Sequence, residues 1–289
     1  MKIPIKRARS RNMKQTSKNL STGDIPVVIF CGGRGTRLKE ETEFIPKPMV
    51  RIGDRPILWH IMKIYYAQGF RRFVLLLGYK GEKIREYIHN YALYANDFTL
   101  THGTSSTKLK YHRRPAESWQ ISCVNTGLDT QTGGRLKKIA DLIKSPVFML
   151  TYGDGVADVD MHALLKEHRN KNRLVTITGV PPPVRFGEIV LKNNEVVSFN
   201  EKPSQASSHL NKSIINGGFF AINSDIFARI SDDESLVFER DVLSVLAKQG
   251  ELAVAPHRGY WQCMDTIRDT EILNEAWKSG NAPWKMWTD

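Results

Sequence analysis

Short apolar runs alternate with segments of helical periodicity along most of the chain, starting near Ile25. Continuous runs of this length are typical of strands that are buried on both faces of a sheet. Helices between such strands provide the crossovers that parallel pairing requires. The pattern therefore predicts an α/β fold with a Rossmann-like, mostly parallel mixed sheet flanked by helices. The clearest strand candidates are residues 27–31, 73–77, 147–151 and 174–179.

Several segments between these strands carry the end signals of helices. Asp54 is a candidate cap for a helix that begins near Pro56 and ends at Gly69. Asp160 is a candidate cap for a helix that follows the turn at 153–155. Further helices are expected at about 81–94, from about 135, and at about 224–230, 235–248 and 266–279.

The rest of the chain predicts a smaller mixed-strand extension of the sheet. Residues 97–125 alternate between apolar and polar positions in the manner of antiparallel strands and end in a strand at 121–125. Proline, asparagine and serine separate the later short strands. No interior linker is long enough to divide the chain, so residues 25–289 are expected to form one domain. The later strands are expected at 186–191, 195–200, 214–222 and 251–255.

The composition of the 289 residues is that of an ordinary globular protein, with 41% hydrophobic and 25% charged residues. No apolar run approaches the roughly 20 residues that cross a bilayer, so membrane insertion is not expected. Three widely spaced cysteines without a CxxC pair favour a reducing, cytoplasmic location over a disulfide framework or a zinc site.

The net charge of +12 is unevenly distributed. Residues 1–24 carry seven lysines and arginines against Asp24 alone, which is half of the excess. Because this extension has few apolar residues, it is expected to be unstructured. A basic arm that contacts RNA or a membrane, or a later start at Met13, are the alternatives. The remaining positive charge suits a body that binds anionic small molecules, so nucleic-acid binding is not expected apart from the tail.

A glycine-rich turn, residues 32–37, leaves the first predicted strand. Glycine lets backbone N–H groups approach a phosphate, and the arginines of the turn add positive charge. The chain contains no GxxxxGK[ST] string of a P-loop, and Leu38 stands where a GxGxxG fingerprint needs its last glycine. Lys47 follows between two prolines, which hold it on a stiff segment. Together the turn and the lysine indicate a polyphosphate site, although each alone is also compatible with a surface loop.

Two aspartates are candidate metal ligands. Asp154, between two glycines, directly follows a predicted buried strand, where open α/β sheets bind their ligands. Its glycine neighbours leave room for Mg²⁺ and its waters, whereas the alternative is a turn aspartate bonded to its own backbone. Asp265 is the leading candidate for a second carboxylate, and it is also a candidate N-cap of the last helix. Neither a close histidine cluster nor a Ser-His-Asp or Cys-His arrangement is evident.

These features together resemble the sugar-phosphate nucleotidyltransferases, and more closely their glucose-1-phosphate cytidylyltransferase branch. The resemblance extends over about residues 26–287 and implies a GT-A-like nucleotidyltransferase domain. The first loop and the Pro-Lys-Pro segment are shared by the wider family, whereas the string at 132–136 and the tryptophan-rich end indicate the cytidylyl branch. The distinctive strings are residues 57–63, 132–136, 151–158, 215–220 and 282–285.

The resemblance implies a role for each matching residue. Lys47 and Arg37 are the expected catalytic residues, with Lys47 at the α-phosphate and Arg37 at the β- and γ-phosphates. Thr130 and Arg135 match positions that contact the cytosine ring, whose O2 and N3 acceptors suit an arginine. The implied nucleotide-binding residues are Phe30, Cys31, Gly32, Gly33, Arg34, Gly35, Thr36, Arg37, Lys47, Thr130 and Arg135, the implied sugar-phosphate-binding residues are Lys202, Asn216 and Gly217, and the implied Mg²⁺ ligands are Asp154 and Asp265.

The reaction implied by the resemblance joins CTP and α-D-glucose 1-phosphate, with Mg²⁺, to give CDP-glucose and pyrophosphate. The resemblance also implies a homo-oligomer and a role in making deoxysugars for a surface polysaccharide such as O-antigen. Two alternatives stay open. The same chemistry could use UTP or dTTP, or the protein could be a non-catalytic subunit that senses nucleotide sugars.

Overall fold

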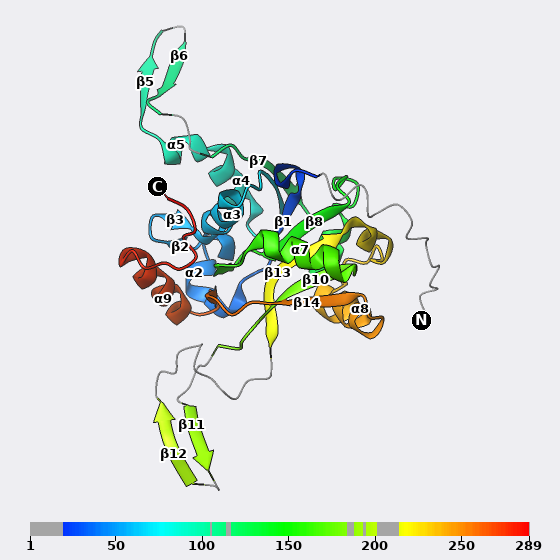
Figure 1. The fold of residues 1–289 in the computed structure, drawn as a ribbon. Coiled ribbons are helices and arrows are strands. Elements are labelled where there is room, and N and C mark those ends of the chain that lie inside the picture. Colours follow the sequence, from blue (N-terminus) through cyan, green and yellow to red (C-terminus); the bar gives the residue numbers. More distant parts are fainter. Residues whose placement is uncertain are drawn as a thin grey trace.

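A seven-stranded sheet forms the centre of the protein (Figure 1). The computed structural model describes residues 20–104, 106–113, 117–183, 188–192, 195–200 and 214–288. Neighbouring strands of the sheet are parallel except where β13 pairs with β8 and β10, which confirms the mostly parallel mixed sheet. In spatial order the strands are β14 (Leu252–Pro256), β10 (Val175–Val180), β13 (Ile215–Asn223), β8 (Val147–Tyr152), β1 (Pro26–Cys31), β4 (Arg72–Leu77) and β7 (Gln120–Asn125).

The sheet separates two hydrophobic cores, which explains the uninterrupted apolar runs. All six residues of β1 are buried, and successive side chains point to opposite faces. One face packs on the core that includes α3 (Ile57–Ala67) and α7 (Met161–Lys171). The other face packs on the core that includes α6 (Thr132–Lys137) and α8 (Ser244–Lys248). The result is a sheet with helices on both sides, as the sequence predicted.

Further helices and several short elements complete the body around this sheet. They include two-residue strands, single turns of helix and one π-helical segment that precedes α8. The helices are α2 (Lys39–Thr42), α4 (Gly81–His89), α5 (Tyr91–Ala95) and α9 (Ile267–Lys278), the short strands are β2 (Arg51–Ile52), β3 (Arg55–Pro56), β9 (Gly155–Ala157) and β15 (Trp261–Cys263), the 3-10 segments are η1 (Thr22–Asp24), η2 (Thr36–Leu38), η3 (Lys47–Met49) and η4 (Ser224–Ala228), and the π-helix is η5 (Phe238–Leu243).

Of the two aspartates predicted to cap helices, one does so and the other does not. Asp160 caps α7, because its Oδ1 accepts a hydrogen bond from the backbone N–H of Ala163 at 2.9 Å. The prediction for Asp54 is wrong: it lies in the turn between β2 and β3, and α3 begins after Pro56 without a side-chain cap. The helix expected at 81–94 is divided into α4 and α5 at Asn90.

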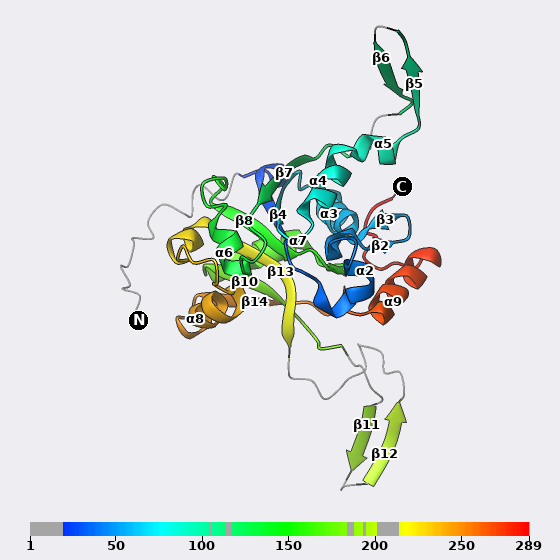
Figure 2. The ribbon, with the colours of Figure 1, turned by 180° about the vertical axis from the view of Figure 1, so that it is seen from behind.

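The strands expected at 97–125 and 186–222 fall into separate groups. β5 (Phe98–His102) and β6 (Thr107–Tyr111) form an antiparallel hairpin, whereas β7 joins the central sheet parallel to β4. β11 (Glu188–Lys192) and β12 (Glu195–Asn200) form a second hairpin, whereas β13 lies inside the central sheet. Both hairpins project from the body, in opposite directions (Figures 1 and 2).

The body begins a few residues earlier than expected. Thr22–Asp24 forms a turn of 3-10 helix, and Leu20 packs against the larger core. The prediction for residues 1–19 lies outside the described residues. Among the helices that the structure describes, none combines the length and the apolar character of a membrane span.

The tryptophan-rich end of the chain encloses a buried histidine. His60 of α3 is 0% exposed, and the ring of Trp277 meets it edge-on with centroids 4.6 Å apart. The His60 Nε2 lies 2.9 Å from the carbonyl oxygen of Ile52, and Trp284 Nε1 donates to Nδ1 at 3.4 Å. This arrangement suits the neutral ring, because a protonated Nδ1 could not accept from Trp284. Burial accordingly lowers the pKa of His60 to about 4.

Lowering the pH from 7.5 to 5.5 should reduce the free energy of unfolding by about 1 kcal/mol through His60. The unfolded chain takes up this proton near pH 6.5, whereas the folded protein resists it down to pH 4, so stability falls as the pH falls. Urea unfolding at both pH values measures the effect. His60→Phe should weaken the pH dependence, and the exposed His89→Gln should retain it. Equal pH dependence in His60→Phe would show that other groups cause it.

Candidate active site

The candidate residues gather at one edge of the central sheet. β1 and β8 are parallel neighbours, so the loop after Cys31 and the turn after Tyr152 leave the sheet side by side. β13 runs in the opposite direction, so its first residues, which include Asn216, lie at the same edge. Such an edge is where open α/β sheets bind ligands.

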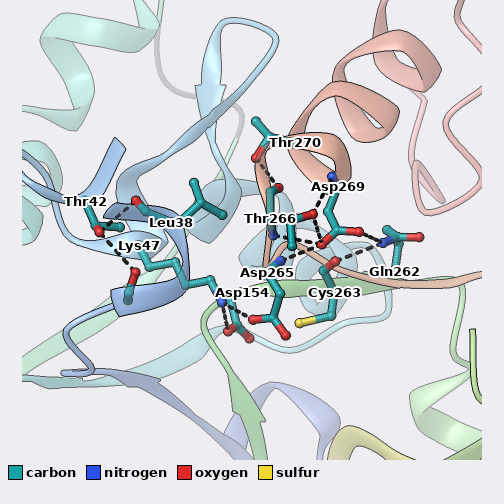
Figure 3. Close-up of polar contacts among 11 residues, drawn as sticks. Leu38, Thr42, Lys47, Asp154, Gln262, Cys263, Asp265, Thr266, Asp269 and Thr270 are labelled. Atoms are coloured by element: carbon teal, nitrogen blue, oxygen red, sulfur yellow. Dashed lines mark hydrogen bonds and ion pairs between the residues drawn. The ribbon is translucent and has the colours of Figure 1, made fainter. Parts of the chain in front are cut away.

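The ammonium group of Lys47 lies between two carboxylates (Figure 3). Its Nζ is 2.7 Å from Asp154 Oδ2 and 2.6 Å from Asp265 Oδ1. The Lys47 side chain is 12% exposed, and the two aspartate side chains are 27% and 20% exposed. The fold therefore brings the expected catalytic lysine and both expected metal ligands together at a partly buried point.

Packing against the Gly-Asp-Gly turn fixes the segment that carries Lys47. Both flanking prolines are buried, and Lys47 begins the 3-10 turn η3. A Cβ added at Gly153 would lie 2.9 Å from Pro48 Cγ and 2.6 Å from the carbonyl oxygen of Phe30. Glycine is thus required at 153 because three chain segments meet there.

The charge of Lys47 is stabilised by its two partners. Burial by itself would lower the pKa of this amine, but attraction to Asp154 and hydrogen bonds to Asp154 and Asp265 outweigh burial and raise the pKa. Lys47 is therefore an ammonium at neutral pH. This partly buried ammonium and its two carboxylates therefore supply fixed charges to the site, and the ammonium is not poised to give up a proton.

Strand pairing explains why Asp265 meets Asp154. β15 pairs antiparallel with β9, with Cys263 opposite Gly155, and the N–H of Met264 donates to the carbonyl oxygen of Asp154 at 2.8 Å. The alternative role of Asp265 as a helix cap is excluded, because Thr266 is the N-cap of α9. Thr266 forms a capping box with Asp269, which also accepts from the N–H of Asp265 at 3.0 Å. The end of β15 and the start of α9 together hold Asp265 toward the turn.

A third potential metal donor, Cys263, stands beside the two carboxylates and was not singled out from the sequence. Its Sγ and one oxygen each of Asp154 and Asp265 lie within 4.8 Å of one another. Burial and then the neighbouring carboxylates raise the pKa of this thiol above its ordinary value. The only feature of the sequence that could have indicated Cys263 as a metal donor is its position two residues before Asp265.

The glycine-rich loop is held by several different contacts. Gly35 has φ of +63°, a left-handed conformation that favours glycine, and its carbonyl oxygen accepts from Thr42 Oγ1 at 3.1 Å. Gly33 is exposed, and a Cβ there would meet nothing within 4 Å, so its backbone is open to a ligand. Arg37 lies in η2, but its side chain falls outside the described part of the structure.

Arg135 clamps the glycine loop to the ends of β4 and β7. The residue is only 4% exposed, and its terminal nitrogens donate to one hydroxyl and four carbonyl oxygens. The guanidinium also packs on Gly32, where an added Cβ would lie 2.3 Å from Nη1. The accepting groups are Thr126 Oγ1 and Gly127 O at 2.7 Å, Leu77 O and Gly32 O at 3.1 Å, and Leu128 O at 3.2 Å. This structural role is seen directly, whereas a contact with the base stays a prediction.

Thr130, the other residue expected at the base, and Arg34 of the glycine-rich loop are both held by polar contacts. Thr130 is 3% exposed, and Lys138 Nζ donates to its Oγ1 at 3.4 Å. Arg34 reaches across to Asp129, with Nη2 and Oδ1 2.7 Å apart. Both side chains of this pair are largely exposed, so it contributes little to stability and leaves Arg34 available to a ligand.

A hydrogen-bonded chain that the sequence did not reveal joins Asn216, at the edge of the site, to the start of α6. Asn216 Nδ2 donates to the hydroxyl of Tyr152 at 3.3 Å, and that hydroxyl donates to Glu239. The other carboxylate oxygen of Glu239 accepts from Thr132 Oγ1 at 2.9 Å, at the start of α6. The ring of Tyr152 stacks on Phe30 with centroids 5.8 Å apart. Tyr152 could have been noticed in the sequence because it directly precedes the Gly-Asp-Gly turn. No sequence signal marked Glu239, because only tertiary packing brings it next to Tyr152.

A pocket opens among these elements. Its walls come from the end of β1, the Lys47 segment and the turn after β8. Cys31 therefore borders the space in which a nucleotide is expected. Gly217 is buried nearby, with its carbonyl oxygen accepting from Trp261 Nε1 at 2.7 Å, and Lys202 lies outside the described residues. The pocket is lined by Phe30, Cys31, Gly33, Lys47, Pro48, Tyr152, Gly153 and Asp154.

Comparison with known proteins defines the class of this protein. A family model described as nucleotidyl transferase matches residues 26–278, and the chain belongs to this family. Within it, the chain is similar to the glucose-1-phosphate cytidylyltransferase of Salmonella typhimurium, with 44% identity over 261 residues that cover 90% of this chain and 98% of the relative. The resemblance recognised from the sequence is thereby confirmed.

A more distant relative is named for another sugar phosphate, and a solved structure shares the fold. A D-glycero-alpha-D-manno-heptose 1-phosphate guanylyltransferase of Campylobacter jejuni is 30% identical over 73% of this chain and 82% of its own. The crystal structure of HddC from Yersinia pseudotuberculosis, complexed with GMP-PN, has a TM-score of 0.62 at 24% identity. It covers 88% of this chain and 99% of that chain, and it supports the fold alone.

Proposed function

We propose that the protein transfers a cytidylyl group from CTP to α-D-glucose 1-phosphate, giving CDP-glucose and pyrophosphate. The convergence of Lys47 with Asp154 and Asp265 beside the glycine-rich loop carries this proposal. The 44% identity to the Salmonella enzyme supports the choice of the nucleotide and the sugar. The site supplies fixed charges of both signs, which a reaction between two anions needs.

The transfer is an in-line, single displacement. A phosphate oxygen of glucose 1-phosphate attacks the α-phosphorus of CTP, the bond from this phosphorus to the oxygen that leads to the β-phosphate breaks, and pyrophosphate leaves. The attacking phosphate is already an anion, so no general base is required. Catalysis consists of positioning and charge neutralisation. Lys47 would stabilise negative charge at the α-phosphorus, and Arg37 would stabilise the departing pyrophosphate.

Asp154 and Asp265 are the proposed ligands of Mg²⁺. Carboxylate oxygens are the donors that Mg²⁺ prefers, and the pair already accommodates a cationic ammonium between its members, so the donor set fits this ion. When bound, Mg²⁺ supplies positive charge that offsets the repulsion between the two phosphate groups. Lys47 now contacts both carboxylates, so it would have to leave at least one of them when the ion binds.

The base is proposed to be recognised beside Arg135 and Thr130. Cytosine has an acceptor at N3 where uracil has an N–H donor, so donors fixed in this region would favour CTP. Lys202, Asn216 and Gly217 are proposed to hold the sugar phosphate. Asn216 supports this part of the proposal, because it lies at the edge of the site and bonds to Tyr152.

Pyrophosphate release should be fastest with CTP when the protein is assayed with glucose 1-phosphate and Mg²⁺. We expect kcat/KM with UTP, dTTP or GTP to be lower by at least about tenfold, because the wrong base leaves polar groups unpaired. Chromatography of the reaction mixture identifies CDP-glucose as the product. A preference for UTP would overturn the choice of base, and release without glucose 1-phosphate would indicate hydrolysis.

A non-catalytic sensor of nucleotide sugars is the second candidate. The presence of Lys47, Asp154 and Asp265 in contact with one another favours the enzyme, since a sensor has no need of all three. Binding of CDP-glucose without pyrophosphate release from any pair of substrates would favour the sensor. The homo-oligomer, the cytoplasmic location and the role in deoxysugar and surface-polysaccharide synthesis stay predictions from the resemblance.

A further inference from the structure

The proposed metal site contains a sulfur donor, the thiol of Cys263, which is not a ligand that Mg²⁺ favours. Among the described residues, the potential ligand group at this site consists of Asp154, Asp265 and the thiol of Cys263, all within 4.8 Å of one another. In a tetrahedral Zn²⁺ site the usual Zn–O and Zn–S distances place the oxygen and sulfur donors about 3.6 Å apart, so these atoms must approach one another by at most about 1.2 Å. Small side-chain adjustments are therefore enough to place all three atoms around one ion.

The backbone holds Cys263 in this position. Cys263 ends β15 opposite Gly155 of β9, and Gln262 Nε2 donates to its carbonyl oxygen at 2.9 Å. The same amide of Gln262 donates to Asp269 Oδ1 at 3.0 Å, which ties β15 to the cap of α9. Figure 3 shows the sulfur beside the Asp265 carboxylate. The three donors thus belong to a preorganised part of the fold.

Sulfur changes the order of metal preference at such a site. Mg²⁺ and its octahedral shell favour oxygen, whereas Zn²⁺ and Cd²⁺ accept thiolate together with carboxylate in a smaller, tetrahedral set. We propose that Cys263 completes an Asp154–Asp265–Cys263 site that takes a thiophilic divalent cation more tightly than Mg²⁺. On binding, the thiol releases its proton to solvent and forms a metal–sulfur bond. Inhibition of transfer by this cation follows, and that consequence rests on the proposed function.

Lys47 competes with any cation at this site. Its ammonium contacts both carboxylates, so a metal ion must displace it from at least one of them. Removing the ammonium should therefore strengthen metal binding even though it weakens catalysis. If Lys47 were needed only for folding, its removal would not strengthen metal binding while weakening catalysis.

Titration of the full-length protein with CdCl₂, without nucleotide or sugar, tests the inference through the ultraviolet charge-transfer absorption of the cadmium–thiolate bond. We expect saturation at one Cd²⁺ per chain, loss of the band in Cys263→Ser and Cys263→Ala, and at least tenfold weaker binding in Asp265→Asn. Lys47→Ala should bind at least tenfold more tightly. Cys123→Ser is the matched control and should behave as the parent, because this cysteine lies on β7, outside the donor group.

The outcomes separate the inference from the proposed function. No band in the parent, or an unchanged band in both folded Cys263 variants, would overturn the inference, and circular dichroism establishes that these variants fold. Tight Cd²⁺ binding at Cys263 in a protein without transferase activity would keep the binding site and overturn the proposed function alone. Mg²⁺-dependent transfer by a protein that binds no Cd²⁺ would keep the proposed function and overturn the inference of a thiophilic site.

Discussion

Lys47→Ala should lower kcat for CDP-glucose formation by about 10²–10³-fold, which corresponds to roughly 3–4 kcal/mol of transition-state stabilisation. The lysine is an ammonium held 2.6–2.7 Å from two carboxylates at the proposed phosphate site. In the variant, no ammonium group is present to stabilise the negative charge that develops at the α-phosphorus. Steady-state kinetics with saturating CTP and glucose 1-phosphate measure the effect.

Two further variants make this result specific. Lys144→Ala removes an exposed lysine and should leave kcat unchanged. Asp154→Asn should weaken activity and shift its Mg²⁺ dependence to higher concentration, because one proposed ligand becomes neutral. Near-normal turnover in a folded Lys47→Ala protein would refute its catalytic role. An unchanged Mg²⁺ titration in Asp154→Asn would assign the metal to another carboxylate.

Arg135→Lys should destabilise the protein by about 3–5 kcal/mol, although the positive charge is retained. Lysine presents one ammonium group, which cannot satisfy the five oxygens that the planar guanidinium now joins. Buried carbonyl groups left without donors carry a large penalty. Urea unfolding measures the change in free energy.

The same substitution separates two roles of Arg135. If the residue chiefly clamps the loop, activity with all four triphosphates should fall together with stability. A variant of normal stability that merely loses its preference for CTP would instead make Arg135 a base-recognition residue. Arg85→Lys, at an exposed position of α4, is the matched control and should change neither property.

Local hydrophobic pattern was sufficient to predict the strands that are buried on both faces of the sheet. The strands at 26–31, 72–77, 147–152 and 175–180 were predicted to within a residue or two, because each is a continuous apolar run buried on both faces. The π-helix before α8 and the break at Asn90 were missed, since helical periodicity tolerates both irregularities. The place of β7 and β13 in the sheet was also missed, because pairing direction depends on distant strands.

The sequence by itself determined which groups are available to the candidate site. It determined a glycine-rich turn after a buried strand, a lysine framed by prolines and an aspartate between glycines, because each is a local device of a few residues. It also carried enough of the family pattern for the class to be recognised, as the match over residues 26–278 confirms.

Only the tertiary structure decided how these groups meet. Lys47 and Asp265 are 218 positions apart, and they touch because β15 pairs with β9 at the turn that carries Asp154. The tertiary structure likewise placed Cys263 beside the two proposed metal ligands and made Arg135 the clamp of the loop. Such contacts join segments that are distant in sequence, so they depend on strand order and packing, which local hydrophobic pattern does not encode.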